Sequence, residues 1–271
     1  MKTLTLTKHH GLGNDFLVTF HPPTADDGVL AAWARRWCER RRGVGADGLI
    51  IGESAPDASA QMVLFNADGS RAEMSGNGVR CFAQALAMRR DDTLPRAMTI
   101  LTDAGIRAVE LTPTEDPGTV LAAVDMGPVV ELDEPAGWPA LGSLPDRPVA
   151  HFDVGNPHTV VGVDDVNAVD LLYLGSRLAD VNLEIVEAGP EPDAVTMRVH
   201  ERGVGLTDAC GTGACAAAVA ASRWGLVSGA PEIVVRMPGG SATVALDRPA
   251  PGRVTLTGPA TYVATIEVST T

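Results

Sequence analysis

The segment NADGSRAEMSGNGVRCFA, residues Asn66–Ala83, is rich in glycine and ends in an apolar run that is typical of a helix. A Gly-x-Gly pair at a helix start lets a ligand approach the backbone N–H groups, where the helix dipole favours an anion. Ser75 directly precedes this pair and is a good residue to cap a helix. On its own, the segment could be no more than a well-capped helix.

The same pattern recurs 135 residues later, which indicates an internal duplication. The shift aligns Phe65–Ala83 with His200–Ala218 and places Ser75 on Cys210. Two further pairs of segments align in the same order: Gly45–Ile51 with Asp180–Val186, which places Asp47 on Asn182, and, at a shift of 142 residues, Gly13–Val18 with Gly155–Val160.

Short strand-like runs outnumber helices on both sides of each aligned segment. This pattern predicts an α+β fold of two pseudo-symmetric domains. Each domain is expected to be a curved, mostly antiparallel sheet wrapped round a central helix, with a ligand cleft between the domains. The Gly/Pro-rich turn at Glu115–Thr119 is the expected domain junction.

The overall charge argues against several kinds of partner. The 271 residues include 34 acidic and 21 basic side chains, a net charge of -13, which repels nucleic acid and anionic membrane surfaces. We therefore expect a small-molecule partner, no nucleic acid and no membrane. The absence of a signal-peptide pattern and of a long apolar run predicts a cytoplasmic protein.

Cysteine and lysine usage limits the possible cofactors. Four cysteines lack the spacing of a metal site and are expected to be free thiols, so no metal is predicted. The only lysines, Lys2 and Lys8, leave almost no residue for a pyridoxal-phosphate Schiff base, so no cofactor is expected.

The two aligned helix starts suggest a reaction. If both face one ligand, a carboxylate is held from two sides, with one side-chain heteroatom above and one below the adjacent carbon. That geometry suits inversion of an amino-acid α-carbon. A helix N-terminus is expected to lower the pKa of Cys210 toward neutrality and make it a usable base. Cys81 and Cys215 lie beyond the two starts and are expected to be packing residues.

At these residues the chain resembles the diaminopimelate epimerase family, cofactor-independent enzymes of lysine and peptidoglycan precursor synthesis. The resemblance runs nearly end to end. It implies a fold of two domains. The first comprises residues 1–119 and a final strand at about 262–271, and the second comprises residues 120–261. It also implies a homodimer. Besides the opening segment, the matching stretches are HGLGNDF (His10–Phe16), RGVGADGL (Arg42–Leu49), GNPH (Gly155–His158), VNLE (Val181–Glu184), HERGVG from His200 and ACGTGA from Ala209.

The resemblance also implies roles for individual residues. Cys210 and Ser75 take the catalytic positions, and His158 and Glu201 take the positions that tune them. Backbone amides at Gly76, Asn77, Gly211 and Thr212 would bind the reacting carboxylate. The second carboxylate and the rest of the substrate would be bound by Arg202, Asn14, Asn66, Asn156, Asn182 and Glu201.

Two residues depart from the pattern of the family. Family members carry cysteine at both helix starts, whereas this chain has Ser75, a much weaker acid than a thiol. Leu206 replaces a usual glutamate, and this loss is expected to alter the support behind Cys210. The sequence thus favours a slow epimerase that converts LL- to meso-diaminopimelate. The alternatives are an isomerase or epimerase of the same fold acting on another amino acid, and a catalytically impaired homologue that only binds the ligand.

Overall fold

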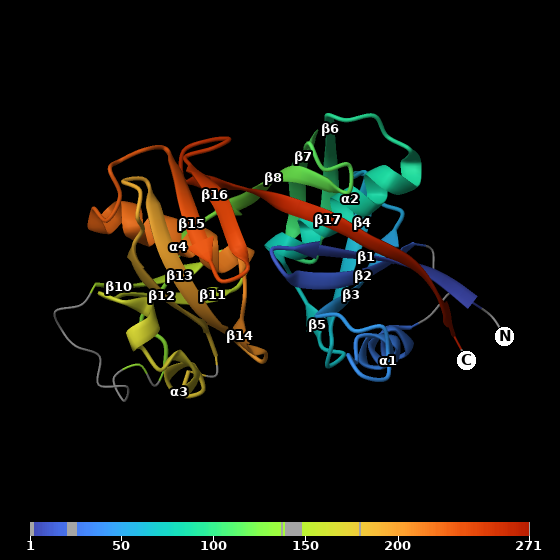
Figure 1. Ribbon diagram of the computed structural model, residues 1–271, viewed down its shortest axis with the longest axis horizontal. Helices are drawn as coiled ribbons and strands as arrows, with labels where there is room; N and C mark the ends of the chain where they lie inside the picture. Colours follow the sequence, from blue (N-terminus) through green and yellow to red (C-terminus); the bar gives the residue numbers. More distant parts are fainter. Residues whose placement is uncertain (1–2, 21–25, 137, 139–147, 179, 271) are drawn as a thin grey trace. The chain divides into compact units, whose positions relative to one another are not determined.

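The computed structural model describes residues 3–20, 26–136, 138, 148–178 and 180–270. The chain forms two compact units (Figure 1). The first runs to Val124 and resumes at Gly258, and the second runs from Asp125 to Thr257. The chain passes between the units within two long strands, β8 (Thr119–Pro128) and β17 (Arg253–Ser269).

The first unit combines strands with two helices. Its remaining elements, in chain order, are β1 (Thr3–Gly11), β2 (Asn14–Phe20), α1 (Asp27–Trp37), β3 (Gly48–Glu53), β4 (Ala60–Asn66), β5 (Arg71–Ala72), α2 (Gly76–Arg90), β6 (Arg96–Thr102) and β7 (Gly105–Pro113). β1 pairs antiparallel with β2 and with β17. β2 and β3 are parallel, β3 and β4 antiparallel, β4 and β6 parallel, and β6, β7 and β8 antiparallel.

Helix α2 lies at the centre of the first unit. It contacts β1, β2, β3, β4, β6 and β7. Every residue from Gly76 to Ala87 is buried, so the helix has no solvent-facing side over this length. A helix buried all round must be enclosed by its own domain, as the strands around α2 in Figure 1 show.

The second unit contains a corresponding set of elements. In chain order they are β9 (Val130–Glu131), β10 (Val149–Asp153), β11 (Pro157–Gly162), the 3-10 helix η2 (Val166–Ala168), α3 (Leu171–Gly175), β12 (Asn182–Ala188), β13 (Ala194–Glu201), β14 (Gly205–Thr207), α4 (Gly211–Trp224), β15 (Glu232–Met237) and β16 (Gly240–Leu246). Helix α4 contacts β10, β11, β12, β13, β15 and β16. Like α2, it is enclosed by the strands of its own unit.

Strand pairing in the second unit repeats that of the first. β10 and β11 are antiparallel, β11 and β12 parallel, β12 and β13 antiparallel, and β13 and β15 parallel. β15, β16 and β17 complete the sheet with antiparallel pairs. The same alternation around an enclosed helix in both units confirms the predicted α+β fold of two similar sheet domains.

The strand register corrects one part of the predicted repeat. β2 and β3 pair Phe16 with Gly48, whereas β11 and β12 pair His158 with Asn182. Because Phe16 and His158 are equivalent at the shift of 142 residues, Gly48 is the counterpart of Asn182. The alignment of Asp47 with Asn182 is therefore wrong by one residue. A short sequence match does not reveal an error of one residue. In a strand, however, a shift of one residue would turn every side chain to the other face of the sheet.

Smaller hydrophobic clusters lie outside the central helices. Asp26 caps helix α1 through a side-chain hydrogen bond from the Val29 amide, and the helix buries Leu30, Trp33 and Trp37. Within the part of the chain that the structure describes, no helix is long and apolar enough to cross a membrane.

Candidate active site

Both central helices begin where the internal repeat predicts. Ser75 caps α2, and its Oγ accepts a hydrogen bond from the Gly78 amide at 3.0 Å. Cys210 caps α4, and its Sγ accepts a hydrogen bond from the Gly213 amide at 3.3 Å. The two residues thus occupy the same local position, each within its own unit.

The second glycine of each Gly-x-Gly pair makes room for the cap. A Cβ atom added at Gly78 would lie 3.1 Å from the Cβ of Ser75 and 3.2 Å from its Oγ. At Gly213 it would lie 3.3 Å from the Cβ of Cys210, and only 2.6 Å from Oε1 of Glu184. The second unit therefore packs a carboxylate against the start of its helix, in addition to the capping side chain.

The Cys210 thiol is buried, with 5% of the residue exposed. Burial raises its pKa well above the usual value, and the nearby carboxylates of Glu201 and Glu184 raise it further. Hydrogen bonds with Thr212 and from the Gly213 amide act in the opposite direction but do not compensate. The predicted lowering of this pKa is therefore wrong for the ligand-free protein, because burial and two negative charges outweigh the helix N-terminus.

Glu201 interacts directly with the Cys210 thiol. Burial raises the pKa of the Glu201 carboxyl and Glu184 raises it further, whereas the Thr207 hydroxyl, His158 and Cys210 lower it. The net effect is an increase in the pKa of Glu201. The Thr207 hydroxyl in β14 donates a hydrogen bond to the Glu201 carboxylate. The neighbouring Leu206 is 46% exposed.

His158 contacts Glu184 and is fully buried. Its Nδ1 lies 2.7 Å from Oε1 of Glu184, whose side chain is also fully buried. Its Nε2 lies 2.8 Å from Oδ1 of Asn156. Asn156 is placed by the turn between β10 and β11, where Gly155 adopts a φ of 88° that favours glycine.

Asn182 links the same turn to Arg202. Its side chain donates to the carbonyl oxygen of Pro157 at 3.0 Å and accepts from the Arg202 amide at 2.9 Å. One side-chain N–H of Asn182 remains for a ligand. Arg202 is exposed, and its guanidinium forms no ion pair with any acidic side chain in the described residues. Its five N–H donors suit a second carboxylate.

A chain of hydrogen bonds orients two amides in the first unit. Arg80 donates to Oδ1 of Asn77 at 2.7 Å, and Nδ2 of Asn77 donates to Oδ1 of Asn14 at 3.1 Å. Nδ2 of Asn14 donates to Asp47 at 2.8 Å. Because Arg80 can only donate and an ionised Asp47 can only accept, the direction of both amides is fixed.

The remaining predicted residues are placed as follows. Asn66 ends β4 and donates to the Ser70 hydroxyl at 3.0 Å. Gly76 and Gly211 are the first residues of α2 and α4, where amides have no partner one turn earlier in the helix. Thr212 follows in α4, and its hydroxyl lies 3.4 Å from the sulfur of Cys210.

The other cysteines are buried free thiols, as expected for packing residues. Burial raises the pKa of Cys38 and of Cys81 to about 12. Lys8 forms an ion pair with Asp15 at 2.8 Å and donates to the carbonyl oxygen of Gly45. Lys2 lies outside the described residues.

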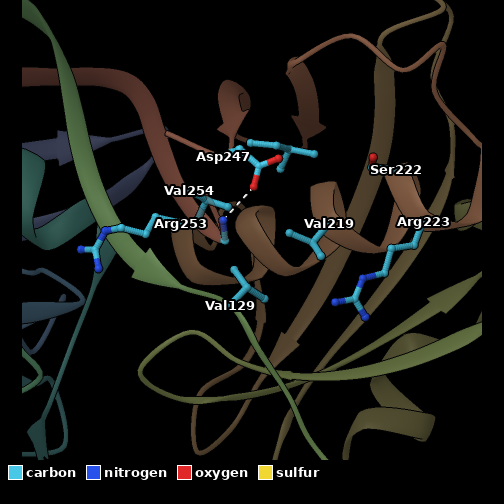
Figure 2. A pocket seen from close by; sticks show the side chains of 9 residues that line it. Val129, Val219, Ser222, Arg223, Asp247, Arg253 and Val254 are labelled. Carbon is cyan, nitrogen blue, oxygen red and sulfur yellow. Dashed lines mark hydrogen bonds between the residues drawn. The ribbon is translucent and has the colours of Figure 1, made fainter. Parts of the chain in front are cut away.

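A pocket of about 230 Å³ lies elsewhere in the second unit (Figure 2). It reaches Ser222, which is twelve residues along α4 from Cys210, or about 18 Å at 1.5 Å per residue. No described residue that lines it belongs to the predicted site, so we do not assign the reaction to this pocket. The lining residues are Val129, Val219, Ser222, Arg223, Leu246, Asp247, Gly252, Arg253 and Val254.

Two charged side chains near the site, Arg80 and Glu184, are given no role by the sequence patterns. Both carry a signal, because each is a charged residue with apolar residues on either side of it in the chain. Charged side chains are rarely buried unless they are paired. A search for such interruptions would have found both.

Comparison with known proteins identifies the family. Residues 6–132 and 151–263 match the family of diaminopimelate epimerase. The chain is 41% identical to the diaminopimelate epimerase of Rhizorhabdus wittichii, over 96% of this chain and 93% of the relative. It is also 41% identical to the diaminopimelate epimerase of Desulforudis audaxviator, over 96% of this chain and 97% of the relative.

Solved structures with lower sequence identity share the fold. A predicted epimerase from Pseudomonas aeruginosa has a TM-score of 0.77 at 16% identity, covering 99% of this chain and all of that chain. A hydroxyproline epimerase from Agrobacterium vitis has a TM-score of 0.71 at 16% identity, covering 98% and 92%. These structures support the fold, and the full-length relatives above give the family. The chain belongs to the diaminopimelate epimerase family.

Proposed function

We propose that this chain epimerises LL-diaminopimelate to the meso isomer without a cofactor, with Cys210 and Ser75 as the catalytic pair. Membership of the family gives the reaction class, an isomerase of lysine biosynthesis. The observation that carries the residue assignment is the matched capping of two equivalent helices by Ser75 and Cys210. Each cap places a heteroatom beside a helix start that suits a carboxylate.

Cys210 is the base in this proposal. Its raised pKa keeps the thiol protonated before substrate binds, so the proton must leave before the thiolate can accept one from the α-carbon. Glu201 accepts the thiol proton in this proposal, because its carboxylate interacts with the thiol and its own pKa is raised. A carboxyl with a raised pKa is a better match for a thiol proton than an ordinary one.

Ser75 is the donor to the opposite face of the carbanion. Its hydroxyl replaces a thiol at the position where the family carries cysteine, and it is a reluctant acid. Loss of a matched acid–base partner lowers rates by about 10²–10⁴-fold, so we expect slow turnover. We also expect faster proton exchange from the isomer whose α-hydrogen faces Cys210.

Substrate recognition is divided between two sets of groups. The amides of Gly76, Asn77, Gly211 and Thr212 bind the carboxylate at the reacting carbon. Arg202 binds the distant carboxylate, together with Asn14, Asn66, Asn156 and Asn182. The exposed Arg202 guanidinium and the fixed direction of the Asn14 amide support this division.

Three further parts of the proposal follow the family resemblance. We infer a homodimer located in the cytoplasm, and we take the two compact units as the two epimerase-like domains. Light scattering of the purified protein tests the dimer. Treatment with hydroxylamine, which removes carbonyl cofactors, tests cofactor independence: the reaction rate should not change. A monomer with full activity would contradict the dimer proposal, and a fall in rate would contradict cofactor independence.

One assay tests the catalytic proposal. Each diaminopimelate stereoisomer is incubated with the protein in deuterated water, and α-deuterium uptake is followed together with stereochemistry. We expect exchange accompanied by slow inversion. Exchange from one isomer without inversion would instead indicate a one-base catalyst. Binding without exchange would indicate a protein that recognises diaminopimelate but does not turn it over.

A further inference from the structure

Glu184 lies at a strand position where the equivalent residue of the first unit is apolar. The parallel strands β2 and β3 pair Val18 with Ile50, and the equivalent strands β11 and β12 pair Val160 with Glu184. Val18 and Val160 are equivalent in the internal repeat. A buried carboxylate therefore stands where the first unit has the fully buried Ile50.

His158 shows the same replacement. Its counterpart in the first unit is Phe16, which is 4% exposed. The second unit has thus exchanged an apolar pair of side chains, Phe16 and Ile50, for an ionisable pair, His158 and Glu184. Both members of the ionisable pair are fully buried.

Stability does not account for this exchange. A buried ion pair is often no more stabilising than an apolar pair of similar size, because both charges lose their hydration. Within the described residues, Oε2 of Glu184 also has no hydrogen-bond partner. The pair is therefore better explained by what it does to its neighbours.

Glu184 lies between the start of α4 and the His158 ring. A Cβ atom added at Gly213 would lie 2.6 Å from Oε1 of Glu184, so the carboxylate packs against the first turn of α4. The positive end of the helix dipole stabilises a negative charge there. His158, at 2.7 Å, supplies the counter-charge.

Both ring nitrogens of His158 face oxygen atoms. Nδ1 lies 2.7 Å from Glu184 Oε1, and Nε2 lies 2.8 Å from Asn156 Oδ1. A carboxylate oxygen and an amide oxygen both accept hydrogen bonds, so this arrangement of oxygens is satisfied when each nitrogen carries a proton. The ring is then an imidazolium, and the Asn156 amide is held with its oxygen toward the ring. Its NH₂ group is left for other partners.

We propose that Glu184 is a positioning residue that selects a carboxylate ligand through His158 and Asn156. By keeping both protons on His158, Glu184 fixes the Asn156 amide with its two N–H donors toward the ligand. Donors are what a carboxylate requires. If His158 loses a proton from Nε2, the Asn156 amide must turn over and present its oxygen, which repels a carboxylate. The ligand part of this inference rests on the proposed function, whereas the ring protonation does not.

The first test measures the ring directly in the ligand-free protein. Nitrogen-15 NMR of the histidine side chains, with His158 assigned by its loss in His158→Phe, reports which ring nitrogens carry protons. We expect two protonated nitrogens on His158 in the wild type and one in Glu184→Gln. Glu187→Gln is the matched control on the same strand, because Glu187 bonds only the Val166 amide among the described residues. A neutral His158 in the wild type, or the same state in Glu184→Gln, would overturn the inference.

The second test measures recognition. In Glu184→Gln we expect the KM for diaminopimelate to rise about 10- to 100-fold, the value of one hydrogen bond to a charged group. We expect kcat to change as well, because Glu184 also raises the pKa of Cys210, so the rise in KM is the readout of the Asn156 contact. A fall in kcat with unchanged KM would contradict a positioning role at Asn156.

A double variant guards against misfolding. His158→Phe with Glu184→Ile copies the apolar pair of the first unit and should keep the wild-type Tm or exceed it. It should show the same rise in KM, and a wild-type KM in this variant would overturn the proposal. If the wild-type protein neither binds nor turns over diaminopimelate, the proposed function fails, and the NMR result still decides the state of His158.

Discussion

The sulfur of Cys210 accepts a hydrogen bond from the Gly213 amide at 3.3 Å, at the first turn of α4. Such a position normally favours a thiolate. Here burial, followed by the carboxylates of Glu201 and Glu184, raises the pKa of Cys210 well above its usual value. The Cys210 thiol is therefore protonated in the ligand-free protein, and its pKa depends on burial and on the charges of Glu201 and Glu184.

Alkylation of Cys210 reports this control. We expect the ligand-free protein to react with iodoacetamide only slowly at neutral pH, with a midpoint above the usual thiol pKa of about 8.5. Glu201→Gln removes a negative charge that raises the pKa of Cys210, so the midpoint should move to lower pH. Mass spectrometry locates the label, and Cys210→Ala is the control. A midpoint that stays the same or rises in Glu201→Gln would contradict this account.

Ser75→Cys should restore the missing acid–base partner. The thiol is a stronger acid than the hydroxyl, so we expect inversion of diaminopimelate to accelerate by about 10²–10⁴-fold. Cys210→Ala should abolish both exchange and inversion. Stereochemical analysis of the product in deuterated water measures both effects. An unchanged inversion rate in Ser75→Cys would show that Ser75 is not the limiting donor.

The two helix-start glycines should respond differently to alanine. At Gly78 the added carbon meets Ser75 at 3.1 Å, which a small shift relieves, and alanine gains about 1 kcal/mol of helix propensity. At Gly213 it meets the Glu184 carboxylate at 2.6 Å and must displace it from His158. We expect Gly78→Ala to be near neutral and Gly213→Ala to lower the free energy of unfolding by about 1–3 kcal/mol. Urea unfolding of both variants measures the difference, and equal effects would contradict the prediction.

Asp15 should contribute to stability at neutral pH but not in acid. Burial alone would raise its pKa, but hydrogen bonds from Arg40 and Lys8 outweigh burial and lower it. A carboxyl whose pKa is lower in the folded chain stabilises the fold above its unfolded pKa of about 4, and this stability is lost as the pH falls through the folded value. Asp15→Asn should therefore cost about 2 kcal/mol at pH 7.

The cost of Asp15→Asn should shrink as the pH falls below about 4, because the carboxyl of the unfolded chain then takes up a proton while that of the folded chain, with its lower pKa, is still charged. Urea unfolding at pH 7 and pH 3 measures the two values. Asp57→Asn, at an exposed position, is the control and should stay within about 0.5 kcal/mol of the wild type. A cost that is the same at both pH values would show that the charge of Asp15 does not matter.

Local sequence signals located both central helices. Ser75 and Cys210 followed by Gly-x-Gly predict capped helix starts, because a small polar cap and flexible glycines act within one turn. The same signals aligned the two halves and so predicted two similar sheet domains. They placed Asp47 on Asn182, however, since a short match cannot detect the one-residue change in register that strand pairing reveals.

The amino-acid sequence by itself determined the helix starts, the duplication and the residue types available for acid–base chemistry. Only the tertiary structure decided the protonation of those residues. The raised pKa of Cys210 comes from burial and from Glu201 and Glu184, which lie on β13 and β12. Desolvation and charge act through space over a few ångströms, so they depend on which strands pack beside α4 and cannot be read from the residues adjacent in the chain.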